Sequence, residues 1–225
     1  MENIRTDELF RNCLYSSIAH AVYTLHNPFF AYEQSWDNYN YNFHFGSSRG
    51  TISFDLKSKI VAGAMRKEDS SRVFLYPNEL SAEDLFRKAS EGIVQLSTSE
   101  TLMYLYDTIG DFTGPVATTG FWLEKEQLFL CDSEPDFLQH GGEYLKVLLN
   151  NLQGVKKYWK EQYGLSTNEI GLADEAFRLY FAGEKKLVLD KSYKAYTKQK
   201  GYEEMLKCLV LCQDLVQVKM SFSSS

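Results

Sequence analysis

The chain has 225 residues, of which 44% are hydrophobic and 24% charged, and its formal net charge is −6. This apolar content can bury a sizeable core and excludes intrinsic disorder, while only 14 glycines and 4 prolines exclude collagen-like and low-complexity chains. No stretch approaches the roughly 18 apolar residues of a membrane span, and residues 1–10 lack the cationic start and apolar run of a secretory signal. We therefore expect a soluble, cytoplasmic protein that contacts no membrane.

The charge is distributed unevenly along the chain. Residues 1–150 carry 12 basic and 21 acidic side chains, a net charge of −9, whereas residues 151–225 carry 12 basic and 9 acidic side chains, a net charge of +3. The two parts therefore attract different partners. The four cysteines do not form the pattern of a disulfide framework, and we expect them to pack as small apolar residues; they are Cys13, Cys131, Cys208 and Cys212.

An amphipathic helix is the first predicted element. Apolar residues recur at helical spacing from Leu9 to Leu25. The dipeptide Asn27-Pro28 should end the helix, because the residue before a proline avoids the helical conformation. Cys13 lies within the apolar stripe and His20 at its edge, so we expect both to pack in the core or at its rim.

A two-residue alternation of aromatic and polar residues over 39–56 predicts a β-hairpin with one apolar face. We expect Gly46 to lie opposite Thr51, with a loop between them. This register keeps every apolar residue on one face, which a slip of one residue would destroy. It has the following cross-strand pairs: Phe45 with Ile52, Phe43 with Phe54, Tyr41 with Leu56, His44 with Ser53, and Asn42 with Asp55.

The remaining elements follow from shorter patterns. A third strand at 60–65 extends the meander, and its small residues 62–64 indicate close packing against it. Capping residues predict two short helices, one starting at Ser81 and one at a capping box of Ser97 and Glu100. The other predictions are a strand at 73–76, a hairpin at 118–131, helices at 144–152, 155–163, 166–183 (with a Ser166–Glu169 capping box) and 202–216, and a frayed tail at 220–225.

Together these elements predict an α+β fold. It consists of an N-terminal helix, an antiparallel sheet built from hairpins with short helices, and a mostly helical C-terminal part. No linker marks a boundary, so we interpret residues 1–225 as a single domain, with its sheet-bearing part at about 1–131 and its helical part at about 132–220.

The polar face of the first hairpin is the leading candidate site. A carboxylate beside a histidine can orient it as a general base, so His44 and Asp55 are the candidate catalytic pair. Arg49, at the tip of the hairpin, is a candidate anion contact. The alternative is the solvated outer face that antiparallel sheets usually have. The candidate binding residues are Asn42, His44, Arg49, Ser53 and Asp55.

Acidic residues and a histidine also cluster after the second hairpin. Their spacing matches neither a calcium loop nor an HExxH zinc helix, and acidic residues before a helix commonly serve as caps. We therefore predict no metal site and no cofactor. The cluster consists of Asp132, Glu134, Asp136, His140 and Glu143.

The lysine-rich segment Lys185–Lys200 is a candidate for nucleic-acid contact. It interleaves lysines, which suit phosphates, with tyrosines, which suit stacking on bases. However, the chain as a whole is acidic and the segment has no arginine, which reads bases better than lysine does. A solvated lysine-rich face is the alternative, and we do not expect a nucleic-acid partner.

The chain holds 15 tyrosines, 15 phenylalanines and 3 tryptophans, more than a core of this size needs. Several lie among acidic and amide residues between Phe29 and Phe45, and such residues are favoured at protein interfaces. We therefore expect a non-enzymatic protein-binding module whose acidic N-terminal part engages a basic partner, as an immunity- or inhibitor-type protein would. The alternatives are a small hydrolase or transferase that uses His44 and Asp55, and a nucleic-acid-associated protein that uses Lys185–Lys200.

Overall fold

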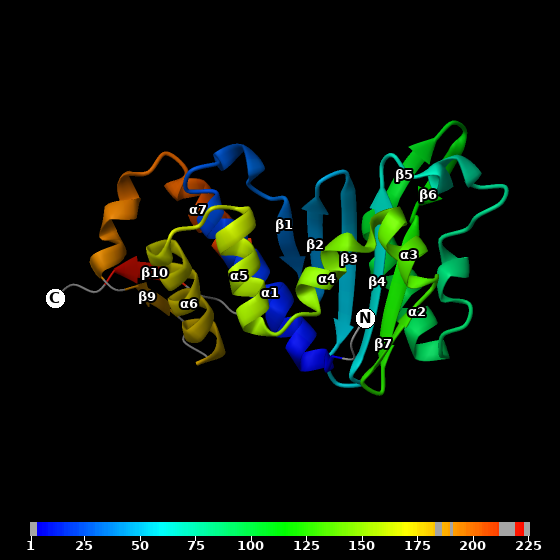
Figure 1. Ribbon diagram of the computed structural model, residues 1–225, viewed down its shortest axis with the longest axis horizontal. Coiled ribbons are helices and arrows are strands. Elements are labelled where there is room, and N and C mark those ends of the chain that lie inside the picture. The colour runs from blue at the N-terminus through cyan, green and yellow to red at the C-terminus, as the bar shows by residue number, and fades with distance from the viewer. Residues whose placement is uncertain (1–3, 183–185, 190, 212–218, 223–225) are drawn as a thin grey trace. The chain divides into compact units, whose positions relative to one another are not determined.

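The computed structural model describes residues 4–182, 186–189, 191–211 and 219–222. The chain forms two compact units: the sheet unit comprises Met1–Phe10 and Tyr39–Leu149, and the helical unit comprises Arg11–Asn38 and Asn150–Ser225. The predicted α+β class is confirmed, with its N-terminal helix, antiparallel sheet and mostly helical C-terminal part (Figure 1). That the two units form one domain stays a prediction.

The main sheet has six strands in the order β1-β2-β3-β4-β7-β8, and the successive pairs from β2 to β8 are antiparallel. Between β4 and β7 the chain leaves this sheet and forms short helices and the separate two-stranded hairpin β5–β6. The strands are β1 (Gln34–Asp37), β2 (Asn40–Phe45), β3 (Ser48–Asp55), β4 (Ile60–Lys67), β5 (Tyr106–Ile109), β6 (Phe112–Pro115), β7 (Thr119–Glu124) and β8 (Gln127–Leu130).

The first hairpin is confirmed, but its predicted register is wrong. The chain turns directly from β2 into β3 at Gly46 and Ser47, and Gly46 supplies a φ of 58° that glycine adopts without strain in tight hairpin turns. The expected loop is therefore strand, so that His44 faces Arg49 and not Ser53. Because the register differs by an even number of residues, the predicted apolar and polar faces are preserved.

The apolar face of the sheet packs against α3 (Glu134–Phe137) and α4 (Glu143–Leu148), which lie across the strands in Figure 1. The ring of Tyr144 on α4 lies 4.9 Å from that of Phe43 on β2. The ring of Phe137 on α3 meets Phe121 on β7 edge to face. Aromatic pairs of this kind fix the helices on the sheet beyond what burial alone provides.

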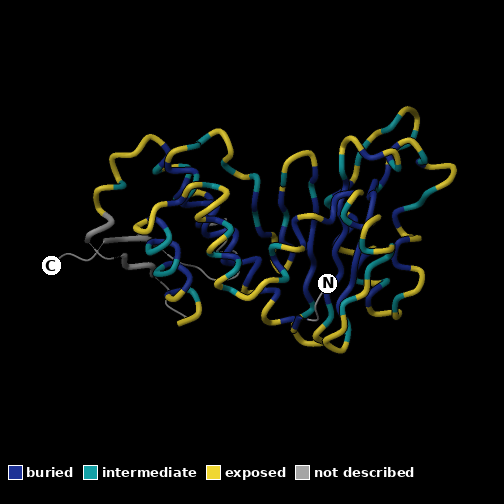
Figure 2. The backbone as a smooth tube through the Cα atoms, viewed as in Figure 1, coloured by how far each residue is buried: buried dark blue, intermediate teal, exposed yellow. Residues whose placement is uncertain are grey.

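The opposite face of the sheet is also covered, as the dark strands in Figure 2 show. Small residues of β4, Ala62 and Ala64, allow a second apolar cluster to form there with Phe86, Ile93 and Leu102, which confirms the predicted close packing. These residues come from η3 (Glu83–Phe86), α2 (Glu91–Ser99) and η4 (Thr101–Leu105). The sheet unit is therefore a sheet between two layers.

Several short elements differ from their predictions. The predicted strand at 73–76 lies largely in the 3-10 helix η2 (Ser71–Leu75). Ser81 precedes only the single 3-10 turn of η3, and Ser97 lies inside α2 where it caps nothing. The predicted frayed tail contains part of β10 (Lys219–Phe222), which pairs in parallel with β9 (Lys186–Leu189). Such pairing between distant segments leaves no local pattern in the sequence.

The helical unit has an aromatic core built around Trp159, the largest of the fully buried side chains. Tyr15 and Phe177 meet edge to face in the same unit, with ring centroids 5.4 Å apart. The predicted Ser166–Glu169 capping box is present at the start of α6. The helices are α1 (Thr6–Tyr23), η1 (Pro28–Phe30), α5 (Leu152–Gln162), α6 (Thr167–Phe181), η6 (Lys191–Lys198) and α7 (Tyr202–Leu211).

The cysteines and the helices of the described residues bear on two expectations from the sequence. Cys13 and Cys208 are free and buried, Cys131 is free and half-buried, and Cys212 lies outside the described residues. In the described part of the chain, none of the helices combines the length and the apolar content that crossing a membrane requires.

Candidate functional site

The structure separates the candidate catalytic pair. His44 lies near the turn at one end of the hairpin, opposite Arg49. Asp55 lies six residues further along β3, roughly 20 Å away at the rise of an extended strand. The carboxylate of Asp55 accepts hydrogen bonds from the backbone N–H groups of Lys57 and Ser58, both at 3.0 Å, and thus stabilises the next turn. The predicted His44–Asp55 pairing is wrong because it depended on the wrong register.

The polar residues in the middle of this face bond to one another and to the covering layer. The hydroxyl of Thr51 donates to the side-chain oxygen of Asn42 at 2.6 Å. Ser53 is fully buried and accepts a hydrogen bond from Thr101 on η4 at 2.9 Å. The middle of the face is thus neither a solvated surface nor an open site.

Arg49 has a counter-ion within its own chain. It lies opposite Arg66 on β4, and Asp107 on β5 forms ion pairs with both guanidinium groups. Arg66 is buried and also pairs with Glu68. His44 lies beside them and is exposed. The loss of part of its hydration and the positive charge of Arg49 lower the pKa of its imidazole. The geometry therefore indicates a network that holds the β5–β6 hairpin on the sheet.

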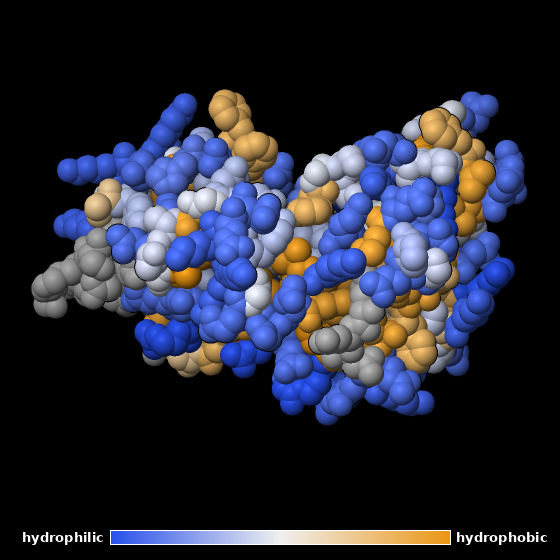
Figure 3. Space-filling model, viewed as in Figure 1, coloured by the Kyte–Doolittle hydropathy of each residue, from blue (hydrophilic) through white to orange (hydrophobic). Residues whose placement is uncertain are grey.

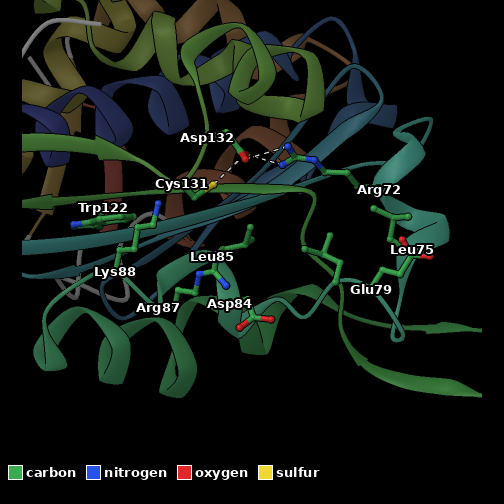
Figure 4. Close-up of a pocket in the computed structure, with 11 residues that line it drawn as sticks. Arg72, Leu75, Glu79, Asp84, Leu85, Arg87, Lys88, Trp122, Cys131 and Asp132 are labelled. Atoms are coloured by element: carbon green, nitrogen blue, oxygen red, sulfur yellow. Dashed lines mark hydrogen bonds and ion pairs between the residues drawn. The ribbon is translucent and has the colours of Figure 1, made fainter.

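A cavity of about 320 Å³ opens between η2, η3 and β7 (Figure 4). Its wall includes an ion pair in which both terminal nitrogens of Arg72 donate to Asp132, at 2.6 and 3.0 Å. Asp132 also accepts from the hydroxyl of Thr119 at 2.8 Å and from the thiol of Cys131. Burial raises the pKa of Cys131 to about 12, so this thiol stays protonated and is a poor nucleophile at neutral pH.

The rest of the cavity has an apolar part and a charged rim of both signs. Figure 4 shows Lys88 near Trp122, and Arg87 near Leu85 and Asp84. Its volume is at the lower end of the range of small-molecule sites, about 300–1,000 Å³. Arg72 and the thiol of Cys131 are both engaged with Asp132, so these two groups serve the structure of the wall.

His140 contacts a serine that no sequence pattern predicts. His140 Nδ1 lies 2.8 Å from the hydroxyl oxygen of Ser70, and both residues are buried. Ser70 also accepts a hydrogen bond from the backbone N–H of Arg72 and so caps η2. The serine is thus engaged in structure and is closed to solvent, which does not suit a nucleophile. Seventy residues separate the pair, and no local motif marks it.

The other members of the predicted acidic cluster have separate partners. Glu143 pairs with Lys67 at 3.4 Å, and Glu134 lies 4.0 Å from Lys146. Asp136 accepts a hydrogen bond from Ser133 at the start of α3. These contacts fix the helices α3 and α4 at their ends.

The lysine-rich segment is described only in part. Lys185 lies outside the described residues, as do the side chains of Lys186 and Lys191. Lys194 and Lys198 are exposed. Contact with a nucleic acid through this segment stays a hypothesis from the sequence.

Exposed aromatic residues gather in the helical unit between α1 and β1. Phe29 is 93% exposed, Phe30 42% and Tyr32 52%. Figure 3 shows apolar side chains that project from the molecule over this loop. We call these three residues the aromatic loop. Three exposed rings within four residues are unusual on a protein surface, where apolar side chains mostly occur singly.

The aromatic loop is supported from below by rings of the helical unit. His20 Nε2 contacts the carbonyl oxygen of Phe30 at 2.8 Å, and the ring of His20 packs against Trp159. The rings of Tyr23 and Phe30 have centroids 6.0 Å apart. The loop is therefore anchored on the core, which lowers the entropy cost of binding through it.

His20 should make the stability of the protein depend on pH. Burial lowers the pKa of His20 from 6.5 to about 4, although its contact with the Phe30 carbonyl acts in the opposite direction. Below pH 6.5 the side chain of His20 is protonated in the unfolded chain but stays neutral in the folded chain down to about pH 4. The free energy of unfolding therefore falls as the pH is lowered. We expect a loss of about 2 kcal/mol between pH 7 and pH 5 from this group.

Urea unfolding followed by circular dichroism at several pH values tests this expectation. The variant His20→Phe keeps an aromatic ring but cannot titrate, so its free energy of unfolding should fall less over the same interval. Equal pH dependence of the two proteins would show that His20 is accessible to protons in the folded state.

The comparisons with known proteins add no relative. No protein-family model matches the chain, and neither a curated protein nor a solved structure is significantly similar to it. The functional assignment therefore rests on the residues themselves.

Proposed function

We propose that the protein is a protein-binding module that docks through the aromatic loop. The observation that carries this proposal is the exposure of Phe29, at 93%, next to two further exposed rings on an anchored turn. Aromatic anchors of this kind dominate the energy of many protein interfaces. The catalytic alternative has lost its support, because His44 and Asp55 lie at opposite ends of the hairpin.

The segment of the chain that carries the aromatic loop has a negative charge. No lysine or arginine occurs between Arg11 and Arg49, whereas Glu33 and Asp37 fall within that interval. The net negative charge of this segment favours a basic partner over an acidic one. An immunity- or inhibitor-type role, in which an acidic surface covers a basic one, fits this chemistry.

Replacement of Phe29 tests the proposal. We expect Phe29→Ala to weaken binding of a purified partner, first captured on the immobilised protein, by about 30-fold, as for an interface hot spot. The fold should persist because Phe29 is exposed. Isothermal titration calorimetry of wild type and variant measures the change.

Phe74 provides the matched control. It is 84% exposed on η2 in the sheet unit, so Phe74→Ala removes an equally exposed ring elsewhere. Its affinity for the partner should equal that of wild type. Unchanged affinity in Phe29→Ala, or equal losses in the two variants, would refute docking through the aromatic loop.

A further inference from the structure

We propose that Glu33, together with the rings of Tyr23, Phe30 and Tyr163, receives a lysine or arginine side chain of the protein partner. This inference rests on the protein-binding function proposed above and names the group that is recognised. We call these four residues the cation receptor.

The receptor residues come together from four segments of the helical unit. Tyr23 is the last residue of α1, Phe30 the last of η1, and Tyr163 follows α5. The ring centroids of Phe30 and Tyr163 lie 6.0 and 5.1 Å from that of Tyr23. Glu33 lies in the turn after η1, where its backbone N–H donates to the Phe30 carbonyl at 3.2 Å.

The charge of Glu33 acts on two of the phenol groups. Burial and the negative charge of Glu33 raise the pKa of Tyr23. The same two causes raise the pKa of Tyr163, although a hydrogen bond with Tyr158 opposes them. Glu33 is therefore anchored by its backbone beside the ring cluster, at a surface where Phe30 is partly open to solvent.

Glu33 differs from two other half-buried carboxylates, Asp107 and Asp132. Asp107 and Asp132 each form an ion pair with an arginine. Within the described part of the chain Glu33 forms no such pair, and burial raises its own pKa. An arriving cation would relieve this desolvated charge, and the attraction is stronger than in bulk water because the site is only partly screened.

The rings select the kind of cation. A cationic group within about 6 Å of a ring centroid is attracted to the face of the ring. Lysine and arginine also carry an apolar stem that can cover exposed aromatic surface. A hydrated inorganic cation has no such stem, so an extended basic side chain matches both the carboxylate and the rings.

Titration of the full chain with model side chains tests the receptor. The probes are N-acetyl-lysine N-methylamide, its arginine counterpart, and the neutral N-acetyl-norleucine N-methylamide, with ring-proton NMR as the readout. We expect both basic probes to shift the ring signals of Tyr23 and Phe30 in a saturable way, with the norleucine probe about fivefold weaker or more. No saturable shift by the basic probes up to about 50 mM, or an equal response to norleucine, would overturn the proposal.

Variants at two glutamates separate the receptor from general acidity. Glu33→Gln keeps the shape and removes the charge, so it should weaken the basic probes about fivefold. Glu161→Gln, at an exposed residue of α5 that pairs with Lys157, should leave their affinity unchanged. Equal effects of the two variants, or none from Glu33→Gln, would count against the receptor.

The partner titrations show which of the two proposals fails. If Phe29→Ala loses the partner while Glu33→Gln keeps both partner and probe, the receptor is wrong and the docking function stands. If the basic probes still bind but neither Phe29→Ala nor Glu33→Gln affects the partner, docking through the aromatic loop is wrong, and with it the assignment of the cation to a protein partner.

Discussion

Trp159→Ala is expected to lower the free energy of unfolding by about 4 kcal/mol, the usual cost of deleting a large aromatic side chain from a core. The side chain is fully buried. Its ring lies 4.3 Å from that of Tyr163 and 6.0 Å from that of His20. Its indole N–H donates to the hydroxyl of Ser16 on α1 at 3.3 Å. The substitution removes these contacts and leaves a cavity beneath the aromatic rings.

Two further variants divide this effect into its parts. Trp159→Phe keeps an aromatic ring but loses the hydrogen bond to Ser16 and some volume, so we expect a loss of about 1–2 kcal/mol. Lys157→Ala, at an exposed position of the same helix, should stay within about 0.5 kcal/mol of wild type. Urea unfolding followed by far-ultraviolet circular dichroism suits all three variants, since it does not depend on tryptophan fluorescence. A loss below about 1.5 kcal/mol in Trp159→Ala would mean that α5 does not pack on α1 as described.

The same substitution links stability to recognition. Tyr163 belongs to the cation receptor and packs against Trp159, so Trp159→Ala should also loosen the ring on which a basic side chain would lie. Exposed binding surfaces depend in this way on the rings that fix them from below.

The two-residue period of the first hairpin was sufficient to predict its faces. Tyr41 and Phe43 are buried as expected, because any even register keeps them on the same side. The register itself depends on the turn. The polar run after Gly46 suggested a loop, whereas the positive φ of that glycine closes the turn with Ser47 alone. The residue pattern therefore predicts on which face of the hairpin His44 lies, but not which residue lies opposite it.

The second layer of the sheet unit could not be predicted for a different reason. Its helices are short, and several are 3-10 turns whose apolar residues show no helical period over a useful length. They cover Ser53 and its neighbours, so this polar face of the sheet is buried inside the protein. Only the small residues of β4, such as Ala62, indicated in the sequence that something packs there.

The aromatic excess between residues 29 and 45 was visible in the sequence, but composition does not say which rings are exposed. Tyr41 and Phe43 alternate within a strand and are buried, whereas Phe29 follows a proline in a single 3-10 turn and is exposed. Tyr163 is far away in sequence and joins this surface only through packing on Tyr23. The residues of the cation receptor are therefore brought together only by the tertiary structure.

Asp132→Ala is expected to lower the free energy of unfolding by about 3 kcal/mol, because it leaves the guanidinium of Arg72 without its counter-ion. Both side chains are largely buried, at 20% exposed for Arg72 and 17% for Asp132. The carboxylate also holds Thr119 and Cys131, so its loss unpairs several donors at once. Asp111→Ala, at an exposed position, should change stability by less than about 0.5 kcal/mol.

The sign of the pH dependence gives this prediction a second test. Burial alone would raise the pKa of Asp132, but hydrogen bonds from Arg72, Cys131 and Thr119 and the charge of Arg72 lower it. The stabilisation is therefore complete above the ordinary aspartate pKa of about 3.9 and is lost as the pH falls through the lower folded value. The difference between wild type and Asp132→Ala should shrink as the pH falls below 4. The double variant Arg72→Leu/Asp132→Leu should recover much of the lost stability, since an apolar pair needs no counter-ion. If the double variant is as unstable as Asp132→Ala, the broken ion pair is not the cause of the loss.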